Sequence, residues 1–141
     1  MEREHRLLRT VADTAAAGHS TLTAALPLAA AREFYAALEE QLQAYSTFLA
    51  EACRLLAAEG LRQPAAGRSR LGSFFVLQVK SMGGEADRQL AALLLQGVHD
   101  SVMTLTAQLN ALGGIDGEAV RLARRLLGSE ETCYRAWKQF L

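Results

Sequence analysis

The chain has 141 residues, of which 50% are hydrophobic and 21% are charged, so a single domain with a sizeable core is expected and global disorder is not. Fifteen basic residues balance fifteen acidic ones, which argues against a protein that binds nucleic acid by neutralising phosphates. Alanine and leucine dominate and prolines number two, a mixture that favours helices. We therefore expect one all-α domain over residues 1–141.

The first predicted helix covers residues 4–26. Its apolar positions recur at three- and four-residue spacing, which is typical of one buried helical face. Pro27 interrupts the hydrogen-bond pattern, so the helix should end or turn there. The predicted stripe contains Leu8, Val11, Ala12, Ala15, His19, Leu22 and Leu26.

The second predicted helix covers residues 29–59, and Gly60 is placed to close it as a C-terminal cap. The connection that follows is basic, because Arg62, Arg68 and Arg70 occur in a stretch that has no acidic residue. A solvated linker explains this composition, and a surface that docks an acidic partner is the alternative.

The third predicted helix covers residues 70–112 and is apolar on most sides. Such a helix is buried by several neighbours or by a second subunit, so a homo-oligomer is expected, with a dimer favoured. Two adjacent glycines, Gly83-Gly84, each cost about 1 kcal/mol inside a helix, and a kink or break is expected there. The interface candidates are Phe74, Phe75, Leu95 and Trp137.

The fourth predicted helix covers residues 116–140 and follows a stop at Gly113-Gly114. Asp116 can cap it, and Glu118 suits the positive end of the helix dipole. The short connections at Pro27 and at Gly113-Gly114 make the helices that they join antiparallel. Four such segments predict an antiparallel four-helix bundle.

Three fragments carry a resemblance to a known family: AAAGHSTLTAALP, YSTFLAEACRLL and LLLQGVHDSVMTLTAQLN. With them the chain resembles a family of small, uncharacterised ferritin-like helical-bundle proteins from anaerobic Gram-positive bacteria. The resemblance covers nearly the whole chain and implies a four-helix fold of ferritin-like outline. It implies no activity and no site residues.

The ferritin-like outline comes without the ligands of a di-iron centre. Such a centre needs Glu-x-x-His motifs, whereas the positions three residues before His19 and His99 hold Ala16 and Gln96. No cofactor is therefore expected. No GxSxG signature of a hydrolase occurs either, so a non-enzymatic protein that acts through protein–protein contacts is the leading hypothesis.

Three polar residues fall where the core should lie: His19, His99 and Glu130. An ionised carboxylate in a core is costly unless it is paired, so Glu130 should reach solvent or meet a partner such as one of the two histidines. The simplest interpretation is a set of satisfied polar groups within the bundle. The alternatives are a metal or small-ligand pocket built from these three residues and a subunit interface.

The location of the protein follows from its N-terminal composition. The first ten residues, MEREHRLLRT, are charged and lack the hydrophobic core of a secretion signal. No run of about 18 apolar residues without a charge occurs, so no membrane helix is expected. Cys53 and Cys133 are then expected to be free thiols, and the protein to be cytoplasmic.

Overall fold

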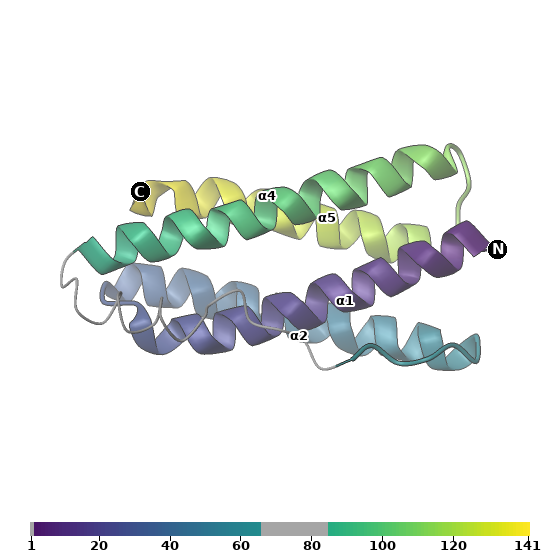
Figure 1. The fold of residues 1–141 in the computed structure, drawn as a ribbon, viewed down its shortest axis with the longest axis horizontal. Helices are drawn as coiled ribbons and strands as arrows, with labels where there is room; N and C mark the ends of the chain where they lie inside the picture. Colours follow the sequence, from purple (N-terminus) through teal and green to yellow (C-terminus); the bar gives the residue numbers. More distant parts are fainter. Residues whose placement is uncertain (1, 66–84) are drawn as a thin grey trace.

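A computed structural model gives the structure of the protein and describes residues 2–65 and 85–141. Over these residues the chain forms four α-helices and two short 3-10 helices and contains no strand, as expected for a helical bundle (Figure 1). The predicted all-α class is confirmed. The α-helices are α1 (Glu2–Ala25), α2 (Arg32–Ala58), α4 (Ala86–Leu112) and α5 (Glu118–Trp137), and the 3-10 helices cover Leu26–Leu28 and Lys138–Phe140.

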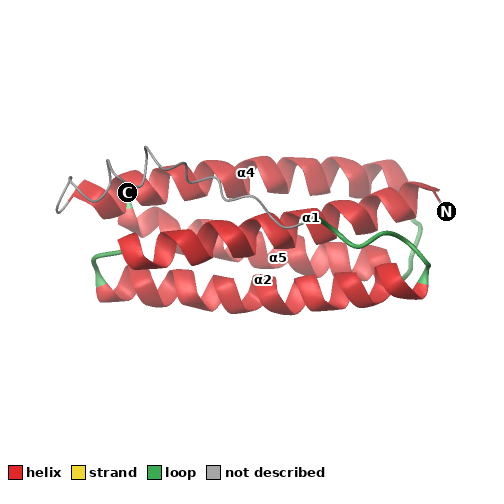
Figure 2. Ribbon diagram, turned by 60° about the horizontal axis from the view of Figure 1, so that its bottom comes forward, coloured by secondary structure: helices red, strands yellow, loops and turns green. Residues whose placement is uncertain are grey.

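Contacts between the helix ends define how the four rods lie. At the start of α1, the His5 Nε2 is 3.7 Å from a carboxylate oxygen of Glu59, just beyond the end of α2. The Arg3 guanidinium donates to the carbonyl of Ala111, near the end of α4. In Figure 1, α1 and α5 accordingly run toward one end of the molecule, and α2 and α4 run toward the other. In Figure 2, α2 and α4 lie on opposite sides with α1 and α5 between them.

The core is one cluster of apolar side chains that all four helices share. Each helix contributes residues at three- and four-residue spacing, which confirms that these stripes face inward. Burying one leucine or phenylalanine contributes about 1.5–3 kcal/mol, so a few such layers hold the rods together. The largest fully buried apolar side chains are Leu7, Leu22, Phe34, Leu38, Leu56, Leu90, Leu105, Leu122, Leu126 and Trp137.

The end of α2 confirms the cap predicted at Gly60. Its φ is +68°, a left-handed conformation that glycine adopts without a steric penalty. The Leu61 amide donates to the Leu56 carbonyl at 2.8 Å, and the Gly60 amide donates to the Ala57 carbonyl at 3.1 Å. This pair of bonds is the Schellman motif, which satisfies carbonyls left open by the last turn.

The start of α2 differs from the prediction, because the helix begins at Arg32 rather than at residue 29. The residues before it are alanines, which have no side-chain acceptor for the open amides of a first turn. Instead the Asp87 carboxylate, in the first turn of α4, accepts hydrogen bonds from the amides of Ala30 and Ala31, both at 2.8 Å. A side chain of another helix therefore binds the amides that lead into α2.

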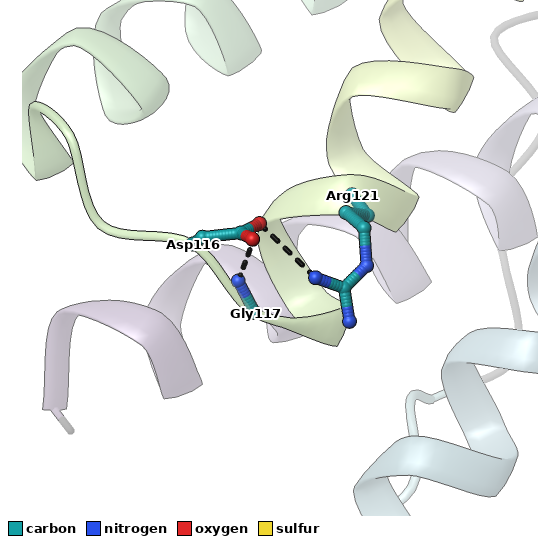
Figure 3. A network of polar contacts seen from close by, with 3 residues as sticks. All are labelled: Asp116, Gly117 and Arg121. Carbon is teal, nitrogen blue, oxygen red and sulfur yellow. Dashed lines mark hydrogen bonds and ion pairs between the residues drawn. The ribbon is translucent and has the colours of Figure 1, made fainter.

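The start of α5 lies two residues later than predicted, at Glu118, after an N-cap at Gly117. Asp116 precedes the N-cap, and its Oδ1 accepts from the Gly117 amide at 2.9 Å and from the Arg121 guanidinium at 3.1 Å (Figure 3). Asp116 thus orders the turn before the helix, and the prediction that it is the cap itself is wrong.

The third predicted helix is described only in its second half, as α4. Residues 70–84, with Phe74, Phe75 and the expected break at Gly83-Gly84, lie outside the described residues. Over α4 the expectation of an apolar surface on most sides is wrong, because Gln96, His99 and other polar residues form an exposed face. Among the described helices, α4 is long and apolar enough to cross a membrane by length and composition, a test that core helices also pass.

Candidate functional site

Glu130, on α5, is a fully buried carboxylate, with 1% of its surface exposed. It accepts a hydrogen bond from the Tyr45 hydroxyl of α2 at 2.7 Å and one from the Ser101 hydroxyl of α4 at 2.6 Å. Such short distances are typical of hydroxyls that donate to a charged oxygen. Because a buried charge is costly without partners of this kind, three helices are joined at one level of the bundle.

The fourth helix reaches this level through Gly18 of α1. A Cβ atom placed there would lie only 2.5 Å from a ring carbon of Tyr45, well inside van der Waals contact. The missing side chain therefore makes room for the tyrosine ring against the backbone of α1, and the ring then reaches Glu130. Thr21, one turn further along α1, is also buried at this level.

A second polar pair lies beside the first. The Ser129 hydroxyl donates to the Oε1 atom of Gln41 at 3.2 Å, and Gln41 is buried. Gln41 is one helical turn before Tyr45, and Ser129 is adjacent to Glu130, so both pairs belong to one level of the core. We call this level the polar layer, made of Thr21, Gln41, Tyr45, Ser101, Ser129 and Glu130.

Two groups have raised pKa values here, Tyr45 of the polar layer and Cys133 beside it. Burial, and then the negative charge of Glu130, raises the pKa of the Tyr45 hydroxyl well above its ordinary range. The same two causes, in the same order, raise the pKa of the Cys133 thiol one turn further along α5. Both groups therefore stay protonated at neutral pH, whereas a base or a nucleophile would need a lowered pKa.

A cavity of about 260 Å³ adjoins the polar layer and lies between α1 and α4. Tyr45 and Glu130 line its inner part, and Trp137, the single tryptophan of the chain, lines it from α5. For comparison, an apolar cavity of about 150 Å³ holds a benzene molecule. The remaining walls include Thr14, Ala17 and Leu22 from α1 and Leu94, Val98 and Thr104 from α4.

The charged side chains that the described residues bring to this cavity are three carboxylates. Asp13 of α1 and Asp100 of α4 are exposed at its mouth, and Glu130 lies inside. Among the described residues that line it, none is lysine, arginine or histidine.

The histidines predicted as partners of Glu130 lie elsewhere. His99 is exposed, and its ring centroid is 6.4 Å from that of Tyr134. His19 is half-buried on α1, and neither imidazole lines the cavity. Over residues 2–65 and 85–141, no three histidine, cysteine or acidic side chains are grouped so that they could hold a metal ion. The proposed cluster of His19, His99 and Glu130 is therefore not formed.

Two of the interface candidates are placed in the core. Leu95 is 5% exposed and Trp137 is 1% exposed, so neither side chain is available to a second copy of the chain. Phe74 and Phe75 lie outside the described residues. The expected free thiols are confirmed, since Cys53 and Cys133 form no disulfide with each other.

Sequence reasoning missed two residues of the polar layer, Tyr45 and Ser101, as the partners of Glu130. A signal for Ser101 was present, because it follows Leu94 and Val98 at helical spacing on the buried side of α4. Nothing in the spacing could have paired it with Glu130, since that pairing depends on how two helices are aligned.

The chain matches no protein-family model, no curated protein and no solved structure. A functional conclusion therefore rests on the geometry of the polar layer and its cavity.

Proposed function

We propose that the protein is a non-enzymatic helical bundle that binds a small organic molecule in the cavity between α1 and α4. The observation that carries this proposal is a cavity of about 260 Å³ with apolar walls and one fully buried carboxylate held by two hydroxyls. Ligand sites are concave, mostly apolar, and contain a few precisely oriented polar groups. They also occur between the helices of bundles.

A purely structural role explains the polar layer less well. A buried ionised group contributes little net stability, and apolar residues of similar volume are often as stable or more stable in its place. A bundle selected for stability alone has no need of Glu130 at this level. A polar group that orients a ligand at the wall of a cavity does need a buried and well-held carboxylate.

The protonation states support binding rather than catalysis. The pKa values of Tyr45 and Cys133 are raised, so the phenol and the thiol are poor nucleophiles at neutral pH. The Ser101 hydroxyl donates to a carboxylate rather than to an imidazole, which is the usual general base for a serine nucleophile.

The test uses a neutral probe, benzyl alcohol, and the fluorescence of Trp137, which lines the cavity. We expect a saturable change in emission for the wild-type chain. Ala17→Leu fills the cavity and should abolish that change, whereas Ala92→Leu adds the same atoms to the exposed face of α4 and should not. Equal binding by both variants would contradict the proposal.

We also propose that the bundle is antiparallel and has a ferritin-like outline. This is supported by the opposite directions of α1 and α2, and of α4 and α5, in Figure 1. It is also supported by the end of α2 and the start of α4, which lie at opposite ends of the bundle. The proposed outline carries no di-iron chemistry, because the sequence has a single Glu-x-x-His, Glu2 to His5, whereas such a centre needs one on each of two helices.

Self-assembly is a second proposal, in which the protein forms a homodimer in the cytoplasm without contact to nucleic acid or membrane. Its support is a group of apolar residues in the sequence, Phe74 to Leu77 with Val79 and Met82, together with Met103, which is 60% exposed on α4. Sedimentation at micromolar concentration tests it, and a monomer would contradict it.

A further inference from the structure

We infer that the ligand of the cavity is an uncharged carbonyl compound whose oxygen accepts a hydrogen bond from the indole N–H of Trp137. This inference rests on the proposed function and adds the chemical class of the ligand and the residue that recognises it. Scaling from benzene in about 150 Å³ allows a molecule of roughly ten non-hydrogen atoms.

The first argument concerns the indole nitrogen of Trp137. The side chain is only 1% exposed, yet its N–H donates a hydrogen bond to none of the described residues. The N–H group of a buried tryptophan usually has an acceptor, because a buried donor without one costs free energy. A ligand that supplies the acceptor removes this cost when it binds.

The second argument concerns the direction in which this N–H faces. Among the described residues, the buried side-chain atoms that have no hydrogen bond are Gln41 Nε2 and Gln108 Oε1. The indole nitrogen is not one of them, so it keeps access to open space. Because Trp137 lines the cavity and is otherwise enclosed, that space is the cavity.

The third argument compares the indole with the hydroxyl groups of the same lining. Tyr45 and Ser101 donate their hydrogens to Glu130, and Thr104 donates its hydrogen to the carbonyl of Asp100 at 3.1 Å. These three hydrogens therefore already have an acceptor within the chain, whereas the indole N–H has none among the described residues. An indole nitrogen can only donate, so the ligand atom that it binds must be an acceptor.

The fourth argument concerns the charge of the ligand. Much of the cavity wall is apolar, formed by Ala17, Leu22, Leu94 and Val98. Such walls contact an aryl or alkyl body, whose burial contributes to affinity. A single N–H donor does not offset the cost of moving an ionised group from water into these surroundings. The acceptor is therefore an uncharged oxygen, and a carbonyl is the simplest group that provides one.

The experiment compares two probes of nearly equal shape, acetophenone and ethylbenzene, of which only the first has a carbonyl oxygen. Ligand-observed NMR measures both affinities, because this readout does not depend on tryptophan emission. Trp137→Phe keeps an aromatic wall and removes the N–H, so the affinity of acetophenone relative to ethylbenzene should fall about fivefold, the effect of one neutral hydrogen bond. The ratio cancels the different cost of removing each probe from water.

Tyr134→Phe is the matched control on α5. It also removes one polar hydrogen from an aromatic ring, but Tyr134 is half-buried and does not line the cavity. The ratio of the two affinities should therefore equal that of the wild type. A ratio that is unchanged in Trp137→Phe as well would overturn the inference.

A second measurement uses the wild-type chain, in case Trp137→Phe does not fold. The chain has a single tryptophan, so its proton–nitrogen NMR spectrum contains one indole N–H signal. Acetophenone should move the indole proton downfield relative to its position with ethylbenzene, because only the ketone accepts a hydrogen bond from it. The same position with both probes would contradict the inference.

The outcomes distinguish this inference from the proposed function. If both probes bind and Ala17→Leu abolishes binding, but neither the ratio nor the indole signal separates the ketone from the hydrocarbon, the cavity binds ligands and the inference of a carbonyl compound is overturned. If acetophenone, ethylbenzene and benzyl alcohol all fail to bind the wild-type chain, the proposed function is overturned as well.

Discussion

Two levels of the same core are built in opposite ways. At the end of the bundle where α1 begins, the buried side chains are leucines from all four helices, Leu7, Leu56, Leu109 and Leu122. At the level of Gly18, the buried groups include a carboxylate, a phenol and an amide beside a cavity. Helical spacing buries both levels, so the difference lies in what is buried. Under the proposed function, the apolar end supplies stability and the polar layer contacts the ligand.

The largest expected effect belongs to the apolar end. Leu56→Ala should lower the free energy of unfolding by about 2–5 kcal/mol, because apolar contacts are lost and a void remains. Met103→Ala, on an exposed side chain, should change it by no more than about 0.5 kcal/mol. Denaturant unfolding measures both, and a loss below about 1 kcal/mol for Leu56→Ala would remove the contrast between the two levels.

The close approach at the polar layer gives the next effect. Gly18→Ala places a methyl group against the Tyr45 ring and should lower the free energy of unfolding by about 1–2 kcal/mol, even after the helix-favouring gain of alanine. Gly128→Ala is the matched control on α5, where a Cβ meets no atom within 4 Å. It should raise stability by about 0.5–1 kcal/mol. Thermal unfolding should therefore show a lower midpoint for Gly18→Ala and a higher midpoint for Gly128→Ala. A shift in the same direction for both variants would contradict the close packing of Gly18 against Tyr45.

Alkaline pH should lower stability through two groups, Tyr45 of the polar layer and Cys133 one turn beyond Glu130. The pKa values of Cys133 and Tyr45 are raised, from ordinary values of 9.0 and 10.0, so the unfolded chain releases these protons at a lower pH than the folded chain. Stability is then unaffected below pH 9 and falls above it, by about 1.4 kcal/mol per pH unit for each group that has passed its ordinary value.

Tyr45→Phe isolates the contribution of the phenol to this loss of stability at alkaline pH. Unfolding free energies between pH 9 and pH 11 should fall less steeply for this variant than for the wild type, with the difference appearing above pH 10. If the unfolding free energies of the variant and the wild type fell with pH at the same rate, the phenol would have the same pKa in the folded and the unfolded chain, which would contradict this prediction.

The hydrogen bonds from the amides before α2 to Asp87 of α4 should have a smaller effect on stability. Asp87→Ala removes the acceptor for the Ala30 and Ala31 amides and should lower the free energy of unfolding by about 1 kcal/mol. Asp116→Ala breaks an exposed contact with Arg121 and should lower it by less than that. Amide hydrogen exchange at the first turn of α2 should increase in the Asp87 variant alone.

The smallest expected change in stability tests the comparison directly. Replacing Tyr45, Ser101 and Glu130 together, with Tyr45→Phe, Ser101→Ala and Glu130→Met, removes both the donors and the acceptor of these two hydrogen bonds. The triple variant should therefore stay within about 1 kcal/mol of the wild type or exceed it, while binding of benzyl alcohol weakens. A large loss of stability would mean that the polar layer holds the fold together.

Local chemistry explains which predictions from the sequence were confirmed. The cap at Gly60 was predictable because a Schellman motif involves residues within one turn of each other. The start of α2 was not, because the amides that lead into it are bound by Asp87, more than fifty positions away. The buried carboxylate was found as a polar residue within a stripe, but the histidines were the wrong partners, since helical spacing says nothing of which residues face each other across two helices.

By itself the sequence determined the helices, the buried face of each one and several of their ends, because propensity, periodicity and capping act over a few residues. Only the tertiary structure decided that Tyr45 and Ser101 hold Glu130, that Gly18 admits the tyrosine ring, and that a cavity lies beside them. These features depend on the relative shift and rotation of whole helices, which is set by packing summed over many long-range contacts rather than by any local pattern.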